Sequence, residues 1–323
     1  MKLQKFLLSM TGLFLVTGLV IFGQTQKDVI DAYNEGVKLI SSDTKGALAA
    51  FEKCVSLAEQ VGDEAKETKD LAITQIPGLY YKLALDEYKK KNLDGAIDGF
   101  KKTKEVAEKY GDRKIAGKCA NIIPKLYYTR GTGNYKKKNY EEALGDFNEA
   151  IALTKSYAKP YLGKALVYDK MGDFAKMKVA ADKAVEVGLI SHDTKTVNST
   201  ERFMQTGAFN RAIKAIQGNN LTQAEEYLRY SIEYGNDSPE VYYQLGKIYQ
   251  SKKEWSKAEE NVQKALTLDK GMDNVKAKYY FILGEIYEAQ SKKSEACSAF
   301  RKALFPPYDE RAKYEIEQVL KCQ

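Results

Sequence analysis

Histidine, tryptophan and cysteine are scarce in this chain. Its 323 residues include one histidine, one tryptophan and four cysteines. No two cysteines form a Cys-x-x-Cys pair, so with a single histidine the chain has no metal-binding motif. It also lacks His-Glu-x-x-His, Gly-x-Ser-x-Gly and a glycine-rich phosphate loop. These absences predict a protein that is not an enzyme and that needs no metal or cofactor.

A long uncharged, mainly apolar stretch occurs at the N-terminus, from Phe6 to Gly23. Lys2 and Lys5 precede it and a polar segment follows. This order is typical of a secretory signal peptide over residues 1–23, cleaved near Gly23, and predicts a periplasmic or secreted protein of a bacterial envelope. The mature chain would then have no stable membrane span. The alternative is membrane anchoring through an uncleaved segment, because about eighteen residues reach the lower limit for spanning a bilayer.

Charge of neither sign dominates. The formal net charge is +7, and positive and negative residues alternate along the chain. Such patterning is typical of solvated helix faces and argues against nucleic acid as a partner.

Two C-terminal stretches repeat the same pattern. In each, Leu-Gly is followed at fixed spacing by Tyr, Ala, an apolar residue and Ala. The two sets are Leu245, Gly246, Tyr249, Ala258, Val262, Ala265 and Leu283, Gly284, Tyr287, Ala296, Phe300, Ala303. A fixed internal period indicates stacked supersecondary units.

This pattern resembles the tetratricopeptide repeat, and weaker copies extend it over most of residues 27–304. The resemblance implies an all-α, right-handed superhelical solenoid of about seven antiparallel helix pairs. A terminal helix over residues 306–323 would cap the exposed end of the stack. The resemblance also implies that a protein or peptide partner binds in the concave groove.

The spacing between copies predicts the domain organisation. Neighbouring copies lie 34 residues apart in places but 47 to 49 apart in others. We interpret the first two long gaps as lengthened second helices followed by further helix, within N-terminal repeats over residues 24–190. The third contains a polar segment without helical period, predicted as a linker over residues 191–200 before C-terminal repeats over 201–305. The single histidine, His192, lies in that segment and is interpreted as incidental.

Tyrosine pairs recur near the start of the first helix in several repeats. One member, Tyr80, Tyr127, Tyr242 or Tyr280, takes the aromatic position of the pattern and is predicted to be core, as is Tyr161. In the repeat family, the next residue faces the groove. The predicted groove residues are Tyr81, Leu85, Tyr88, Lys89, Tyr128, Thr132, Tyr135, Lys136, Tyr243, Lys247, Phe281 and Glu285. Packing of these tyrosines against the neighbouring repeat remains the alternative.

Two cysteines lie where antiparallel helices would bring them together. Cys297 begins the second helix of the last repeat, and Cys322 ends the terminal helix. An oxidising compartment would permit a disulfide bond between them.

These features together predict a noncatalytic protein-protein interaction scaffold or adaptor of the bacterial envelope. The alternative is an envelope glycan-binding module that uses the groove tyrosines, because their rings can stack on sugars. The sequence leaves the oligomeric state open.

Overall fold

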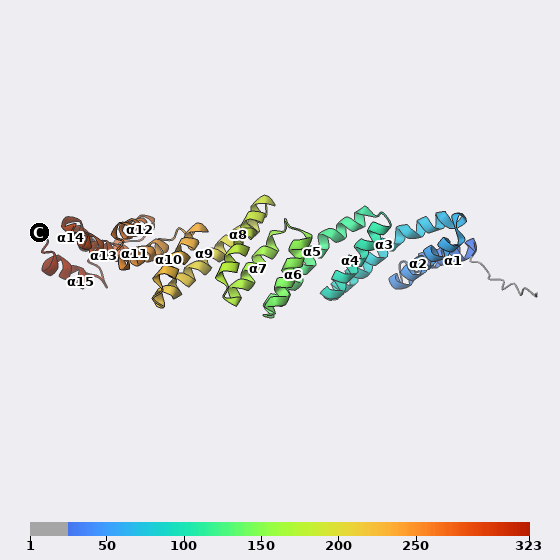
Figure 1. The fold of residues 1–323 in the computed structure, drawn as a ribbon, viewed down its shortest axis with the longest axis horizontal. Coiled ribbons are helices and arrows are strands. Elements are labelled where there is room, and N and C mark those ends of the chain that lie inside the picture. Colours follow the sequence, from blue (N-terminus) through green and yellow to red (C-terminus); the bar gives the residue numbers. More distant parts are fainter. Residues whose placement is uncertain (1–24) are drawn as a thin grey trace, which may run out of the picture. The chain divides into compact units, whose positions relative to one another are not determined.

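The structure is a computed structural model that describes residues 25–323; the predicted signal peptide over residues 1–23 lies outside the described residues. Within this range every regular element is a helix, and no helix is long and apolar enough to cross a membrane. The helices follow one another in consecutive pairs (Figure 1). The pairs are α1 (Gln26–Leu39) with α2 (Thr44–Val61), α3 (Lys66–Lys89) with α4 (Leu93–Lys109), α5 (Arg113–Lys136) with α6 (Tyr140–Leu153), α7 (Ala158–Met171) with α8 (Phe174–Ile190), α9 (Thr194–Gln217) with α10 (Leu221–Glu233), α11 (Pro239–Ser251) with α12 (Trp255–Leu268), and α13 (Asp273–Ala289) with α14 (Lys293–Lys302).

These seven pairs confirm the predicted all-α repeat fold. A short 3₁₀ turn, Asp63–Ala65, precedes α3. After the last pair come α15 (Asp309–Tyr314) and a π-helical turn (Glu315–Val319), the predicted terminal cap. The chain divides into two compact units, one ending at Leu126 and the other beginning at Tyr127. The division falls within α5, not at the predicted linker.

Glycine lets the two helices of a pair cross closely. A Cβ added at Gly36 would lie 2.8 Å from the ring of Phe51, and one at Gly284 would lie 2.6 Å from the ring of Phe300. Both rings are fully buried. A hydrogen at the glycine position therefore makes room for an aromatic side chain that fills the crossing.

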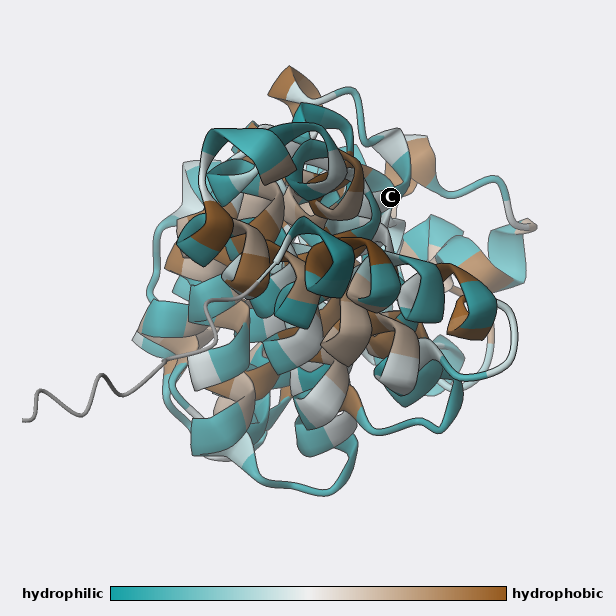
Figure 2. Cartoon of the chain, turned by 90° about the vertical axis from the view of Figure 1, so that its right-hand side faces the viewer, coloured by the Kyte–Doolittle hydropathy of each residue, from teal (hydrophilic) through white to brown (hydrophobic). Residues whose placement is uncertain are grey.

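The turn inside most pairs has one recurring conformation. The residue just before the second helix's N-cap is left-handed, with φ between 57° and 67° at Lys91, Lys138, Asn219, Lys253 and Ser291. His192 takes the same conformation between α8 and α9, with φ of 58°. Figure 2 shows that the connecting loops are mostly hydrophilic, whereas apolar residues concentrate in the helices.

Lengthened first helices account for most of the long spacings between repeats. Helices α3, α5 and α9 each have 24 residues, against 14 in α7 and 13 in α11. The second helices α2 and α4 have 18 and 17 residues, against 14 in α6 and α12. As predicted, they end near Gly-Asp, at Val61 and Lys109, and further helix follows each of them. Pro77 and Pro124 lie inside α3 and α5 without ending them.

The predicted linker over residues 191–200 is wrong, because α9 begins at Thr194. The Asp193 carboxylate caps the helix by accepting from the Thr196 backbone N–H at 3.1 Å. Thr196 and Thr200 are buried, and the Thr200 hydroxyl donates to the Thr196 carbonyl at 2.8 Å. Threonines whose hydroxyls bond within the helix can occupy core positions that the sequence pattern reserves for apolar residues.

A charge network joins α10 to α11. The Glu225 carboxylate accepts hydrogen bonds from the Tyr249 hydroxyl at 2.6 Å, from Lys252 Nζ at 2.6 Å and from Arg229 Nε at 3.1 Å. Burial alone would raise the pKa of Glu225, but these donors outweigh it and lower the pKa to about 2.

We expect this network to make the stability of the protein depend on pH in the acidic range. Because the folded-state pKa of Glu225 is depressed, the network's contribution to the free energy of unfolding is fully present above about pH 4.5. This contribution, up to roughly 3 kcal/mol, is lost as the pH falls toward about 2. Glu225→Gln should lower the urea midpoint at pH 7 and flatten its pH dependence between 4.5 and 2. An unchanged pH profile in the variant would refute the role of Glu225.

The glycine crossing is testable with two glycines of one helix, α5. A Cβ at Gly131 would lie 2.9 Å from Phe147, whereas one at Gly133 meets nothing within 4 Å. We expect Gly131→Ala to destabilise by about 1–3 kcal/mol through overpacking. Gly133→Ala should be neutral or stabilise by about 0.5–1 kcal/mol, because alanine orders a helix better than glycine. Urea unfolding of the two variants measures both effects, and equal destabilisation would contradict this view of the crossing.

Candidate functional site

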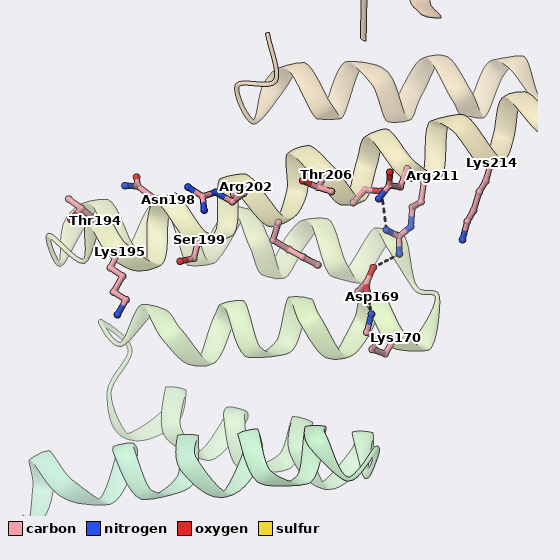
Figure 3. A pocket seen from close by; sticks show the side chains of 13 residues that line it. Asp169, Lys170, Thr194, Lys195, Asn198, Ser199, Arg202, Thr206, Arg211 and Lys214 are labelled. Carbon is pink, nitrogen blue, oxygen red and sulfur yellow. Dashed lines mark hydrogen bonds and ion pairs between the residues drawn. The ribbon is translucent and has the colours of Figure 1, made fainter. Parts of the chain in front are cut away.

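A wide polar cavity lies along α9, in the unit that begins at Tyr127. Figure 3 draws its lining side chains. Its volume is about 1220 Å³. Asp169 and Lys170, at the end of α7, form one side, and α9 supplies the other lining residues. Those are Thr194, Lys195, Asn198, Ser199, Arg202, Phe203, Thr206, Gly207, Asn210, Arg211 and Lys214.

The single carboxylate of the lining, Asp169, is already paired. Arg211 Nη2 donates to Asp169 Oδ1 at 2.6 Å, and Lys170 Nζ donates to Oδ2 at 3.0 Å (Figure 3). Burial works to raise the pKa of Asp169, but hydrogen bonds from Arg211 and Lys170 prevail and lower it. The carboxylate therefore stays ionised and anchors α9 to the end of α7.

Three cations of the lining have no such partner. Lys195, Arg202 and Lys214 are exposed, and within residues 25–323 no carboxylate lies within 4.0 Å of their charged nitrogens. Lys195 also interacts with Asp193, whose pKa it helps to lower. With Asp169 as its single carboxylate, the cavity wall still carries an excess of positive charge.

Neutral polar groups lie between these cations. Asn198, Thr206 and Asn210 continue the same exposed face of α9, at spacings of three or four residues from Lys195 to Lys214. Asparagine carries both a donor and an acceptor, as a peptide backbone does. We call Lys195, Asn198, Arg202, Thr206, Asn210 and Lys214 the α9 face.

Sequence reasoning missed the α9 face because it assigned part of it to a linker. A signal was present: the six residues are polar, free of acidic groups, and spaced by three or four. The threonines at core positions of the same helix hid its amphipathic period.

The predicted groove residues of the first unit share one face of α3. Tyr81 is half-buried, with its ring 5.4 Å from that of Phe100 and Lys118 Nζ 5.7 Å from its centroid. Leu85 is half-buried, whereas Tyr88 and Lys89 are exposed. Lys89 pairs with Asp86 at 3.0 Å. Exposure is therefore concentrated at the C-terminal end of α3.

The predicted groove residues on α5 are mostly occupied by neighbouring side chains. The half-buried Tyr128 ring lies 5.9 Å from Phe147 and 5.6 Å from Tyr157. The Thr132 hydroxyl donates to the Tyr128 carbonyl at 2.8 Å. Tyr135 is half-buried beside Tyr140, and Lys136 is exposed.

The prediction that Tyr243 and Phe281 are open to a partner is wrong. Tyr243 is 8% exposed and Phe281 is 3% exposed. Tyr279 packs on Tyr243, with centroids 5.4 Å apart, and Tyr308 packs on Phe281 at 5.3 Å. The alternative of packing against the following element holds at both positions.

The other two predicted residues of this region remain at the surface. Lys247 is exposed, with its Nζ 5.5 Å from the centroid of the Tyr243 ring. Glu285 is half-buried and accepts a hydrogen bond from Gln250 Nε2 at 2.8 Å. None of the twelve predicted residues lines the α9 cavity.

The complementary prediction, that the first tyrosine of each pair is core, holds only in part. Tyr127 is 5% exposed. By contrast, Tyr80, Tyr161, Tyr242 and Tyr280 are half-buried. Tyr80, Tyr242 and Tyr280 still pack against the core without being fully enclosed. The Tyr80 hydroxyl, for example, donates to Glu52 at 2.6 Å. A tyrosine at this position keeps its polar tip at the surface while its ring packs.

Cys297 of α14 and Cys322 form a disulfide bond, with Cα atoms 5.9 Å apart. This is the pairing expected from the sequence. Cys54 and Cys119 are buried free thiols.

Family comparison assigns the repeats. One model described as tetratricopeptide repeat matches residues 124–157, and a second with the same description matches 158–187, 239–271 and 277–304. This chain is a tetratricopeptide repeat protein. The matched segments cover α6 with the end of α5, and the pairs α7–α8, α11–α12 and α13–α14. The repeat that contains α9 lies outside the matches, consistent with its lengthened first helix.

Solved tetratricopeptide repeat structures resemble the chain only distantly. YrrB, described as having an unusual peptide-binding site, is 18% identical with a TM-score of 0.33; the match covers 58% of this chain and 90% of YrrB. A repeat protein from Parabacteroides merdae is 16% identical with a TM-score of 0.29, covering 89% of this chain and 96% of that one. Identities and TM-scores this low carry no information about what this chain binds. No curated protein matches the chain in sequence.

Proposed function

We propose that this tetratricopeptide repeat protein is a noncatalytic scaffold that binds an extended, acidic segment of another protein along the α9 face. The observation that carries the proposal is the unpaired positive charge of Lys195, Arg202 and Lys214 beside a cavity of about 1220 Å³. Repeat proteins of this kind act as protein-interaction scaffolds, and a polar cavity wall favours a polar partner.

The dimensions of the α9 face suit a short extended peptide. Lys195 and Lys214 are separated along the helix by about 28 Å, at about 1.5 Å per residue. An extended chain rises about 3.4 Å per residue, so about eight or nine residues span that distance. Arg202 lies about 10 Å from Lys195, which corresponds to about three residues of the peptide.

Charge and hydrogen bonding would share the recognition. Carboxylates of the partner would meet the three cations, and Asn198 and Asn210 would bond its backbone. Exposed charges are screened over about 8 Å at physiological ionic strength, so binding should weaken as salt is added.

The structure offers less support for glycan binding. Sugar stacking needs open aromatic faces, yet Tyr243 and Phe281 are buried and Tyr128 is flanked by Phe147 and Tyr157. Of the predicted groove tyrosines, only Tyr88 is exposed. Phe203 is the one aromatic residue of the α9 cavity lining.

Removing the three cations tests the binding proposal. We expect Lys195→Gln/Arg202→Gln/Lys214→Gln to weaken binding of a labelled nine-residue peptide with three glutamates by at least tenfold, because three charge pairs are lost. Fluorescence anisotropy at two salt concentrations measures the effect. The matched control is Lys137→Gln/Lys155→Gln/Lys253→Gln, which removes three exposed lysines of the same unit outside the cavity.

The control variant should bind like the unmodified chain, and a peptide with glutamine in place of glutamate should not bind. If both triple variants lost peptide binding equally, net charge alone would explain the effect. That result would overturn the assignment to the α9 face.

The envelope location belongs to the same proposal. It is supported by the basic, apolar and polar order of residues 1–27 and by the Cys297–Cys322 disulfide, since such bonds persist in oxidising compartments. A scaffold there would meet exported proteins.

Export predicts a specific mature N-terminus. Mass spectrometry of the protein from a bacterial host should find a chain that begins at Gln24, in the periplasmic or secreted fraction. A chain that keeps Met1 and sediments with membranes would instead indicate an uncleaved anchor.

A further inference from the structure

The chain's own C-terminal segment covers the aromatic surface formed by α11 and α13. The Tyr308 ring lies 5.3 Å from that of Phe281, and the hydroxyls of Tyr308 and Tyr243 interact electrostatically. Arg311 lies over the other part of this surface, with its guanidinium carbon 4.9 Å from the Phe281 centroid. Arg311 Nη2 also donates to Glu285 Oε1 at 2.7 Å. Two side chains one helical turn apart thus fill the positions predicted from sequence to face a partner.

This cover adds few fully buried residues, although Tyr308, Ile316 and Leu320 pack against the core of the last repeats. Of the six residues of α15, only Ala312 is buried, whereas α13 buries seven residues. The Arg311 side chain remains 66% exposed although it is ion-paired, and exposed ion pairs contribute little to stability. The segment therefore has the character of a bound peptide more than of a core helix.

A covalent tether keeps the cover in place. The Cys297–Cys322 disulfide joins the end of the segment to α14, 25 residues away in sequence. A segment tethered at both ends competes with a free peptide at an effective concentration in the millimolar range. While the bond is intact, a partner must compete with this tethered segment.

We propose that Tyr243, Phe281 and Glu285, which we call the C-terminal groove, form a second binding site for a partner protein segment carrying tyrosine and arginine one helical turn apart. Residues 308–311 are its intramolecular occupant. Opening of the disulfide loosens this occupant. In that step a dithiol supplies two electrons and two protons, so that the two cysteines become thiols and the dithiol becomes a disulfide. The chemistry of the partner is set by the groove, which offers a ring, a hydroxyl and a carboxylate.

Labelled peptide binding tests the proposal on the full chain. The probe is a peptide of residues 306–316, and the proteins are the oxidised chain, the same chain treated with dithiothreitol, and Cys297→Ser/Cys322→Ser. We expect the reduced chain and the cysteine variant to bind the probe at least tenfold more tightly than the oxidised chain. Tyr308→Ala/Arg311→Ala in the full chain should have a similar effect, because it removes the contacts of the occupant.

Peptide variants avoid any question of misfolding. A probe in which the tyrosine and arginine equivalent to Tyr308 and Arg311 are alanine should not bind. Because the probe also carries acidic residues, it is measured on the Lys195→Gln/Arg202→Gln/Lys214→Gln chain as well, where binding should be unchanged. This control separates the C-terminal groove from the α9 face, so either site can fail without the other.

Three results would overturn the proposal. One is equal binding by oxidised and reduced chains, and another is equal binding of the alanine probe. The third is dimerisation of the cysteine variant that is lost with Tyr308→Ala, which would assign the groove to a second copy of this chain rather than to a partner.

Discussion

The contact between a glycine of one helix and an aromatic ring of the next is the interaction on which this structure depends. Phe147 of α6 shows it best, since its ring fills the space beside Gly131 of α5 and also beside Gly163 of α7. One ring thus closes a helix pair and joins it to the following pair. Neither helix of a repeat can bury its apolar face alone, so the stack forms only where these crossings are tight.

Once the crossings are fixed, function is left to the faces that the crossings do not use. Lengthening a first helix adds such a face without disturbing the crossing, because the extra turns precede it in the chain. In α9 the added turns carry Lys195, Asn198 and Arg202, and the cavity lies beside them. At the C-terminus, Tyr308, just before the short α15, and Arg311 within it cover a face that an internal repeat would leave to its neighbour.

The repeat fold could be predicted from sequence because its determinants are local, with small and aromatic residues at fixed spacing. The number of pairs and the terminal cap followed from that spacing. The candidate site could not be predicted in the same way. Thr196 and Thr200 occupy core positions and conceal a helix as a polar segment. Which tyrosine of an adjacent pair is buried depends on about 100° of rotation around the helix and on the neighbouring element that packs against it. Tyr243 and Phe281 are buried by Tyr279 and Tyr308, residues 36 and 27 positions later in the chain, a contact that no local pattern encodes.

Site-specific photocrosslinking most directly tests the central claim, that the α9 face rather than the tyrosine groove of α5 holds the partner. A photoreactive residue would replace Thr206 in one variant and Tyr128 in another, both expressed in the native host. The predicted result is crosslinking from position 206 to an acidic segment identified by mass spectrometry, with little from position 128. Efficient capture from position 128 and none from position 206 would contradict it.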